Sequence, residues 1–269
     1  MNIFQAIFYG IIQGITEFLP ISSTAHLNIA QIIIDPHATT ESMRIVDVAM
    51  HMGTLAAVII FFFKDWINLF KKGFSQPKST DGKLFWYIII ATIPAAIIAL
   101  VFNKASEKIS NNLIIISIAL IGLGIVLYFA DKLSEKTVNL EKVGLTNSLL
   151  IGLSQALALI PGVSRSGITI TTGRLLKIDR VSAAKFTFLL STPTLLGAGI
   201  FKLKDLVLPH SQYLPFAVGI LTAAIVGALC IKFLLDFIKT KGFAAFALYR
   251  CALGAVILIL VVTGVLKAY

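Results

Sequence analysis

The chain has 269 residues, of which 57% are hydrophobic and only 13% are charged, and its mean hydropathy is +0.91. This composition excludes a soluble domain and indicates an integral membrane protein. The net charge of +10 does not indicate a nucleic-acid partner, because the lysines gather in loops between apolar runs without an aromatic-plus-basic motif. We expect a single membrane domain over residues 1–269 that contacts membrane lipids.

The first apolar segment, at about 3–34, is broken at its centre by the stretch QGITEFLPISSTAH of residues 13–26. Ionisable groups are costly in hydrocarbon and are kept there mainly for function. Broken backbone at membrane depth persists only where it is buried in protein or lines a wet cavity. We therefore expect a re-entrant helix–turn–helix, and the alternative is a full span with a polar kink. No basic region precedes it, so we do not expect a cleaved signal peptide.

Gln13 and Glu17 are four residues apart and therefore share a helix face. Apolar residues flank Glu17 and Pro20 follows it, which favours a general base or a divalent-cation ligand over a carboxylate at the membrane surface. This acid is therefore our first candidate for chemistry.

The hydroxyl cluster Ser22, Ser23 and Thr24 is suited to capping a second half-helix. A half-helix N-terminus also attracts anions, so a hydroxyl here could bind a phosphate or attack it. His26 lies at helical spacing from the serines and is a candidate base, acid or nucleophile, although a lone histidine is more often structural.

Six apolar runs are long enough to cross a bilayer at about 20 residues each, which predicts an all-α polytopic fold. The loops at 64–85 and 131–146 are rich in lysine, so we expect them to be cytoplasmic and both termini to face outside. Cys230 and Cys251 lie in apolar runs without CxxC spacing and are expected to be inert thiols. The six expected spans are 45–63, 86–103, 112–130, 183–201, 214–235 and 246–266.

A second broken segment, at about 147–176, contains PGVSRSGIT at residues 161–169. Gly162 allows close backbone approach to a ligand, and Arg165 supplies a fixed, always-charged fork for phosphate. Hydroxyl donors surround this arginine at Ser164, Ser166 and Thr169. Arg174 lies nearer the end of the segment and is expected to snorkel to the headgroups.

The two broken segments echo each other, since Gly10-x-x-Gln13 and a downstream proline and serines resemble Gly152-x-x-Gln155 and the residues after it. We expect repeat halves at about 1–103 and 147–269, with the span 112–130 as a linking helix that inverts the second copy. Inverted repeats with broken helices place a site near the midplane, where the halves meet. This site would combine an arginine suited to phosphate with an acid, a histidine and hydroxyls inside the membrane. A lipid phosphate is therefore its natural substrate.

The two motifs resemble those of the undecaprenyl-diphosphate phosphatase family, the bacitracin-resistance proteins. Q-x-x-x-E at 13–17 with FLPxSSTxH at 18–26 fits the first family motif, and PGxSRSGxT at 161–169 fits the second. Tyr249-Arg250 resembles a further family dipeptide. The resemblance covers nearly the whole chain and departs at Gln13, where many members carry a second glutamate.

The resemblance implies hydrolysis of undecaprenyl diphosphate to the monophosphate and phosphate, which recycles the lipid carrier of peptidoglycan synthesis and confers bacitracin resistance. It implies a divalent cation, Mg²⁺ or Ca²⁺, and a site open to the outer side of the bacterial plasma membrane. Glu17 would be base or metal ligand, Arg165 would grip the diphosphate, and Ser23, His26 or water would be the nucleophile. The residues of the two motifs, with Arg250 from the family dipeptide, are expected to bind substrate, namely Gln13, Ser22, Thr24, Gly162, Ser164, Ser166, Thr169 and Arg250.

Three other functions compete with this interpretation. A transporter or flippase for a polyprenyl phosphate would also use inverted repeats and broken helices. An acid phosphatase-like lipid phosphatase would need a histidine and an aspartate suitably spaced after Ser164-Arg165, and these are absent. A channel would not need an acid, a histidine and an arginine together. The sequence does not fix the oligomeric state, for which a homodimer is one option.

Overall fold

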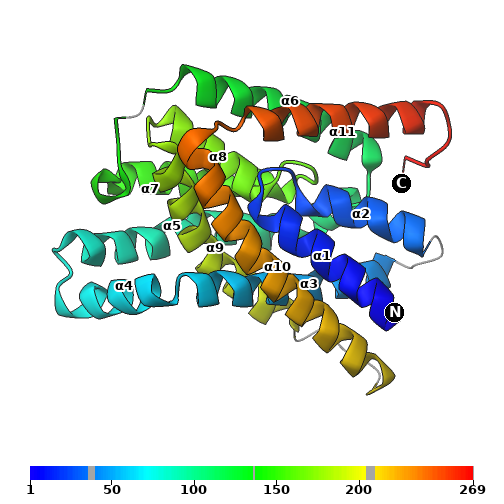
Figure 1. Cartoon of the computed structure of the whole chain (residues 1–269), viewed down its shortest axis with the longest axis horizontal. Helices are drawn as coiled ribbons and strands as arrows, with labels where there is room; N and C mark the ends of the chain where they lie inside the picture. Colours follow the sequence, from blue (N-terminus) through cyan, green and yellow to red (C-terminus); the bar gives the residue numbers. More distant parts are fainter. Residues whose placement is uncertain (36–39, 136, 204–209, 269) are drawn as a thin grey trace.

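The structure, a computed structural model, describes residues 1–35, 40–135, 137–203 and 210–268 and is built from helices throughout these ranges (Figure 1). Six of the helices are long and apolar enough to cross a membrane. They confirm the six expected spans and the all-α polytopic fold. These helices are α3 (Thr40–Phe61), α5 (Thr80–Ile109), α6 (Leu113–Leu133), α9 (Arg180–Leu203), α10 (Tyr213–Thr240) and α11 (Ala244–Val262).

Both broken segments form helix–turn–helix pairs. The first pairs α1 (Ile3–Phe18) with α2 (Ser23–Ile34), and the second pairs α7 (Leu145–Ser154) and the 3₁₀ turn η2 (Gln155–Leu159) with α8 (Arg165–Leu175). At about 1.5 Å per residue, α1 is about 24 Å long and too short to cross a hydrocarbon core of about 30 Å. The breaks are where the sequence predicts them, and the re-entrant path of each pair stays a prediction.

The two turns are built in the same way. Ser22 (φ 76°) and Ser164 (φ 70°) both lie in the left-handed region, which is rare for residues with a side chain. Each serine caps the helix that follows, because its hydroxyl accepts a hydrogen bond from the main-chain N–H three residues on, at Ala25 and Gly167. A half-helix therefore begins immediately after each turn, with its N-terminus directed inward.

Small residues let the first pair approach the spanning helices. A Cβ on Gly10 would lie 2.6 Å from the carbonyl oxygen of Gly219 in α10, and one on Gly14 would lie 2.8 Å from the main-chain nitrogen of Gly227. Close backbone approach at glycine is typical of membrane helix packing. The first broken pair is thereby held against α10 over most of the length of α1.

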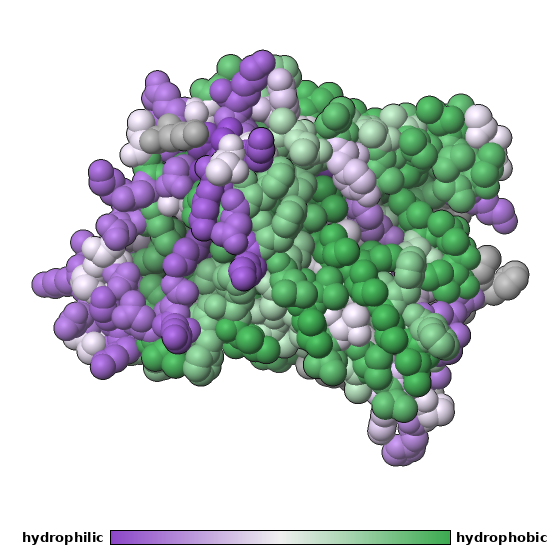
Figure 2. Space-filling model, viewed as in Figure 1, coloured by the Kyte–Doolittle hydropathy of each residue, from purple (hydrophilic) through white to green (hydrophobic). Residues whose placement is uncertain are grey.

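One helix was not expected. The lysine-rich segment predicted as the loop 64–85 instead forms the amphipathic helix α4 (Phe63–Ser75), which turns back along α5 (Figure 1). The rings of Phe70 and Phe85 pack edge to face at 5.9 Å, and Lys72 pairs with Asp81 at 2.6 Å. Hydrophilic residues gather at this end of the molecule, whereas both termini lie at the other end (Figures 1 and 2).

The expectation that Arg174 snorkels to the headgroups is wrong. Its side chain is fully buried, and Nε donates to Oδ1 of Asp131 at 2.9 Å. Arg180 donates to the same carboxylate from Nε and Nη2, at 2.8 and 2.9 Å. Since a buried guanidinium needs a charged partner, Asp131 on α6 fixes the end of α8 inside the protein.

Candidate active site

The two turns contact each other directly. The hydroxyl of Ser166, in the first turn of α8, lies 3.0 Å from the carbonyl oxygens of both Glu17 and Leu19, at the end of α1. Ser166 is buried, as is most of the interface around it. Residues about 150 positions apart in the sequence are thereby brought into one site, as the paired motifs predict.

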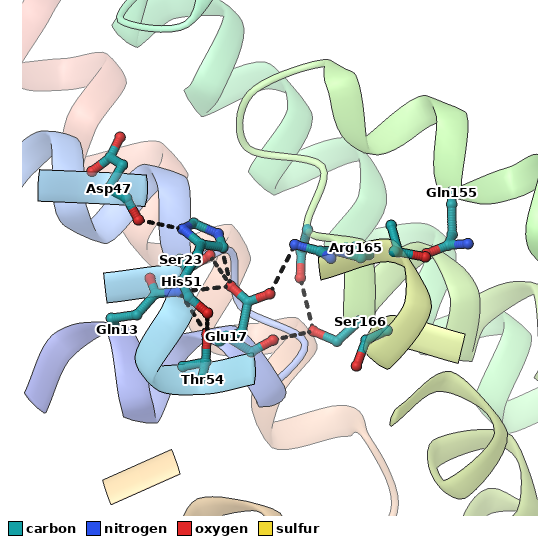
Figure 3. A network of polar contacts seen from close by, with 12 residues as sticks. Gln13, Glu17, Ser23, Asp47, His51, Thr54, Gln155, Arg165 and Ser166 are labelled. Atoms are coloured by element: carbon teal, nitrogen blue, oxygen red, sulfur yellow. Dashed lines mark hydrogen bonds and ion pairs between the residues drawn. The ribbon is translucent and has the colours of Figure 1, made fainter. Parts of the chain in front are cut away.

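Glu17 is the centre of this site (Figure 3). Its side chain is only 6% exposed, and its Oε1 accepts a hydrogen bond from Nη2 of Arg165 at 3.0 Å. Its Oε2 accepts from Ser23 Oγ at 2.8 Å and from Gln13 Nε2 at 3.1 Å. One buried carboxylate therefore joins the acidic motif, the hydroxyl cluster and the arginine motif.

Two residues of the network were missed by the sequence analysis, and both come from α3. Nε2 of His51 lies 3.4 Å from Glu17 Oε2, and Thr54 Oγ1 lies 3.4 Å from Gln13 Nε2 (Figure 3). His51 lies within the expected span 45–63, so the rule that ionisable residues inside a membrane are functional could have found it. Thr54 gives no comparable signal, because threonines are common in membrane helices.

His26, one of the nucleophile candidates, lies apart from Glu17. Its Nδ1 bonds the carbonyl oxygen of Ser22 at 2.7 Å, and its Nε2 bonds the hydroxyl of Tyr249 at 2.7 Å, with the two rings stacked. A carbonyl oxygen only accepts, so Nδ1 carries the hydrogen and Nε2 accepts from the tyrosine when the ring is neutral. Of the two side chains proposed as nucleophiles, Ser23 is the one in contact with the carboxylate.

A polar pocket lies between the two turns. Both broken pairs contribute to it, and α3 supplies His51. Arg165 and the carboxylate face it together with hydroxyls from both capped helices, so the pocket presents one fixed cation and several hydrogen-bond donors around one acid. The lining residues are Glu17, Ser23, Thr24, His51, Ala158, Ile160, Gly162, Ser164 and Arg165.

Several predicted substrate ligands have their polar groups engaged within the protein. Ser22 and Ser164 use their hydroxyls as helix caps, although Ser164 also lines the pocket. Thr169 donates to the carbonyl oxygen of Arg165 at 2.8 Å and accepts from Thr187 at 3.0 Å. These contacts position the backbone that carries Arg165.

Arg250 is fully buried and also lies outside the lining. Its guanidinium donates to the carbonyl oxygen of Pro20 at 3.1 Å in the first turn, and to those of Gly162 and Val163 at 3.0 Å in the second. Further bonds, at 3.3 and 3.4 Å, reach main-chain oxygens of α6. One side chain from α11 therefore ties the two turns together.

The site does not contain a preformed cage for a divalent cation. No group of three or more histidine, cysteine or acidic side chains clusters within the described ranges. Glu17 is the one carboxylate of the pocket, and both its oxygens accept hydrogen bonds. Gln13 Oε1, however, is a buried oxygen without a hydrogen-bond partner. This donor set fits a Mg²⁺ or Ca²⁺ ion that takes one or two protein oxygens and completes its shell with substrate phosphates.

The arrangement suits cleavage of a phosphate ester or anhydride. A carboxylate that accepts from a serine hydroxyl can take its proton during attack. An arginine beside it can stabilise negative charge on the phosphoryl oxygens. Because α2 and α8 both begin at the pocket, their N-terminal N–H groups add to the positive potential.

Comparisons with known proteins give the same class of chemistry. Residues 6–256 match the family described as bacitracin resistance protein BacA. A protein of Caldicellulosiruptor bescii named undecaprenyl-diphosphatase is 47% identical over 262 residues, which cover 96% of this chain and 97% of the relative. Relatives of the same name from Moorella thermoacetica and Nocardioides sp. are 46% and 40% identical, and cover 96% and 100% of this chain and 97% and 100% of their own.

Proposed function

The chain belongs to the bacitracin resistance protein BacA family, and we propose that it hydrolyses undecaprenyl diphosphate to undecaprenyl phosphate and inorganic phosphate. The observation that carries this proposal is the single carboxylate of Glu17, which accepts from Ser23 on one oxygen and from Arg165 on the other. The proposed base is thereby within hydrogen-bond distance of both the nucleophile and an anion-binding cation. The reaction would recycle the lipid carrier of cell-wall synthesis and so confer bacitracin resistance.

Substrate binding rearranges the arginine. Before binding, Arg165 and Glu17 neutralise each other at 3.0 Å inside the protein. A diphosphate entering the pocket offers more negative charge than one carboxylate, and its oxygens suit the planar guanidinium fork. Arg165 therefore moves onto the diphosphate and frees Glu17 Oε1, while the apolar tail of the substrate remains among the membrane lipids.

The hydroxyl of Ser23 attacks the terminal phosphorus. As the Oγ–P bond forms, Glu17 takes the serine proton and the bond between the terminal phosphorus and the bridging oxygen breaks. Undecaprenyl phosphate leaves, with the negative charge on its oxygen stabilised by Arg165 and the helix N-termini. Glu17 then loses this proton to solvent. Water attacks the phosphoserine with Glu17 as base, the bond between phosphorus and Ser23 Oγ breaks as Glu17 returns a proton to that oxygen, and inorganic phosphate is released. Direct attack on the terminal phosphorus by a water that gives its proton to Glu17 yields the same products.

A divalent cation fits beside these residues. Glu17 would hold it, with oxygens of the diphosphate as further ligands. Such an ion would neutralise phosphate charge and polarise the phosphoryl group. Because position 13 is a glutamine and Glu17 is the one acid in the pocket, the protein alone would bind the ion weakly.

The proposed location is the bacterial plasma membrane, with the pocket open to the outer side. The lysine-rich end at α4 and the start of α5 would be cytoplasmic by the positive-inside rule. The termini lie at the other end (Figure 1). The diphosphate group left after cell-wall synthesis is exposed on the outer side, so this orientation presents the site to its substrate.

Phosphate release by purified, detergent-solubilised protein tests the proposal. We expect release from undecaprenyl diphosphate with Mg²⁺ or Ca²⁺, loss of release with EDTA, and loss in Glu17→Gln, which preserves the size of the side chain but cannot act as a base. Release without any gradient separates hydrolysis from transport. A folded wild-type protein that binds the lipid but releases no phosphate under these conditions would favour a transporter or flippase.

A further inference from the structure

The geometry points to His51 as the positioning residue of Glu17: it holds the carboxylate toward Ser23 when Arg165 leaves for the diphosphate. This inference rests on the proposed function of the same pocket. His51 belongs to neither sequence motif and comes from α3, a spanning helix outside both broken pairs. It is nevertheless within 3.4 Å of the carboxylate and lines the pocket.

The histidine ring is fixed in one orientation. Its Nδ1 bonds the main-chain oxygen of Asp47, one helical turn earlier, at 2.7 Å. The oxygen only accepts, so Nδ1 carries a hydrogen and Nε2 is directed at Glu17. Gln31 in α2 donates to Asp47 Oδ1 at 2.9 Å and joins α2 to this turn of α3. The ring therefore has little freedom to follow the substrate.

The two oxygens of Glu17 have different kinds of partner. Oε1 accepts from Arg165, which has to exchange the carboxylate for phosphate oxygens if it is to bind substrate. Oε2 faces His51, Ser23 and Gln13, which do not need to move. His51 is the partner of Oε2 that a spanning helix fixes, so it keeps this oxygen beside the nucleophile after Arg165 has left.

Contact with the carboxylate requires a donor at Nε2. A neutral amide that places one N–H at the same point would supply this donor, so a substitution that keeps the donor and its reach tests whether His51 acts by position.

Three substitutions of His51 separate the effect of its Nε2 donor from the effect of its volume. His51→Leu removes both nitrogens with little change in volume. His51→Gln carries an amide N–H donor that can approach Oε2, and His51→Asn carries the same amide on a side chain one methylene shorter. His210→Gln, in the exposed 3₁₀ turn η3 (His210–Gln212), is the matched control outside the site.

Steady-state hydrolysis of undecaprenyl diphosphate, with thermal unfolding of each variant in detergent, tests the inference. We expect kcat to fall about 10²-fold in His51→Leu, as for loss of a correctly placed base, with KM within about threefold of wild type. His51→Gln should recover to within about fivefold of wild-type kcat, and His51→Asn should not.

A His51→Leu variant with wild-type kcat would overturn the inference. So would a rise in KM alone, which would make His51 a substrate ligand, or a His51→Gln variant no better than His51→Asn. If His51→Leu does not fold, the glutamine and asparagine variants decide. Wild-type protein that releases no phosphate would instead refute the proposed function, so the two failures are distinguishable.

Discussion

In the proposed reaction, Arg165 is the residue on which substrate affinity and transition-state stabilisation both depend. Its substitution by alanine should lower kcat/KM by at least about 10³-fold, somewhat more than loss of one oxyanion donor, because a full charge is removed as well. Arg165→Lys keeps the charge but not the fork and should recover only part of the loss. The measurement is phosphate release by folded protein, with Lys108→Ala as a control cation outside the pocket. Wild-type activity in Arg165→Ala would refute the site assignment.

The residues of the site could be predicted where chemistry and sequence position agreed. Glu17, Ser23 and Arg165 were identified because polar groups interrupt apolar segments, and all three converge on the pocket. Helical spacing also brought His26 into consideration, yet spacing shows which face a residue shares and not where its ring is directed. His51 could have been marked as functional from its place inside a span, but its contact with Glu17 depends on how α3 packs against α1, which local patterns do not encode.

At the scale of elements, the two turns depend on Arg250. Its guanidinium has main-chain carbonyl oxygens as partners, and removing it leaves buried acceptors without donors at about 1–3 kcal/mol each. We therefore expect Arg250→Met to lower the free energy of unfolding by about 3 kcal/mol or more. Thermal unfolding in detergent measures this.

Arg250→Lys distinguishes the bridging of the two turns from the effect of a positive charge at this position. Arg250→Lys keeps the positive charge, but one ammonium group cannot bridge both turns, so kcat should fall even where the protein stays folded. Lys267→Met, at the exposed end of the chain, is the matched control. A lysine variant with wild-type turnover would show that the two turns hold their positions without the bridge.

The elements themselves were largely predictable, because a run of about 20 apolar residues has few alternatives in a membrane. Helix α4 was not, since its amphipathic pattern was hidden in a lysine-rich stretch. The repeat halves also remain a prediction. The packing of α1 and α3 on α10 resembles that of α7 and α9 on α5, and α6 packs along α11. In that correspondence α11 is the counterpart of α6, whereas the repeat expected from the sequence treats 112–130 as a linking helix.

For the whole molecule, the charge distribution predicts orientation. The lysine-rich end holds the turn between α4 and α5, and the termini lie at the opposite end (Figures 1 and 2). Lysine and arginine are retained on the cytoplasmic side during insertion. Lys78 and Lys267 are exposed at these two ends and are expected to lie on opposite sides of the membrane.

Single cysteines at these positions test the orientation with a membrane-impermeant maleimide. We expect Lys267→Cys to be labelled in intact cells and Lys78→Cys only after permeabilisation, because the positive-inside rule places the lysine-rich end in the cytoplasm. The unsubstituted chain is the background control, since Cys230 is buried and Cys251 is partly buried. The reverse pattern would place the lysine-rich end outside, so the positive-inside argument would fail for this chain. Hydrolysis by the purified protein would be unaffected, because the chemistry of the pocket does not depend on which side it faces.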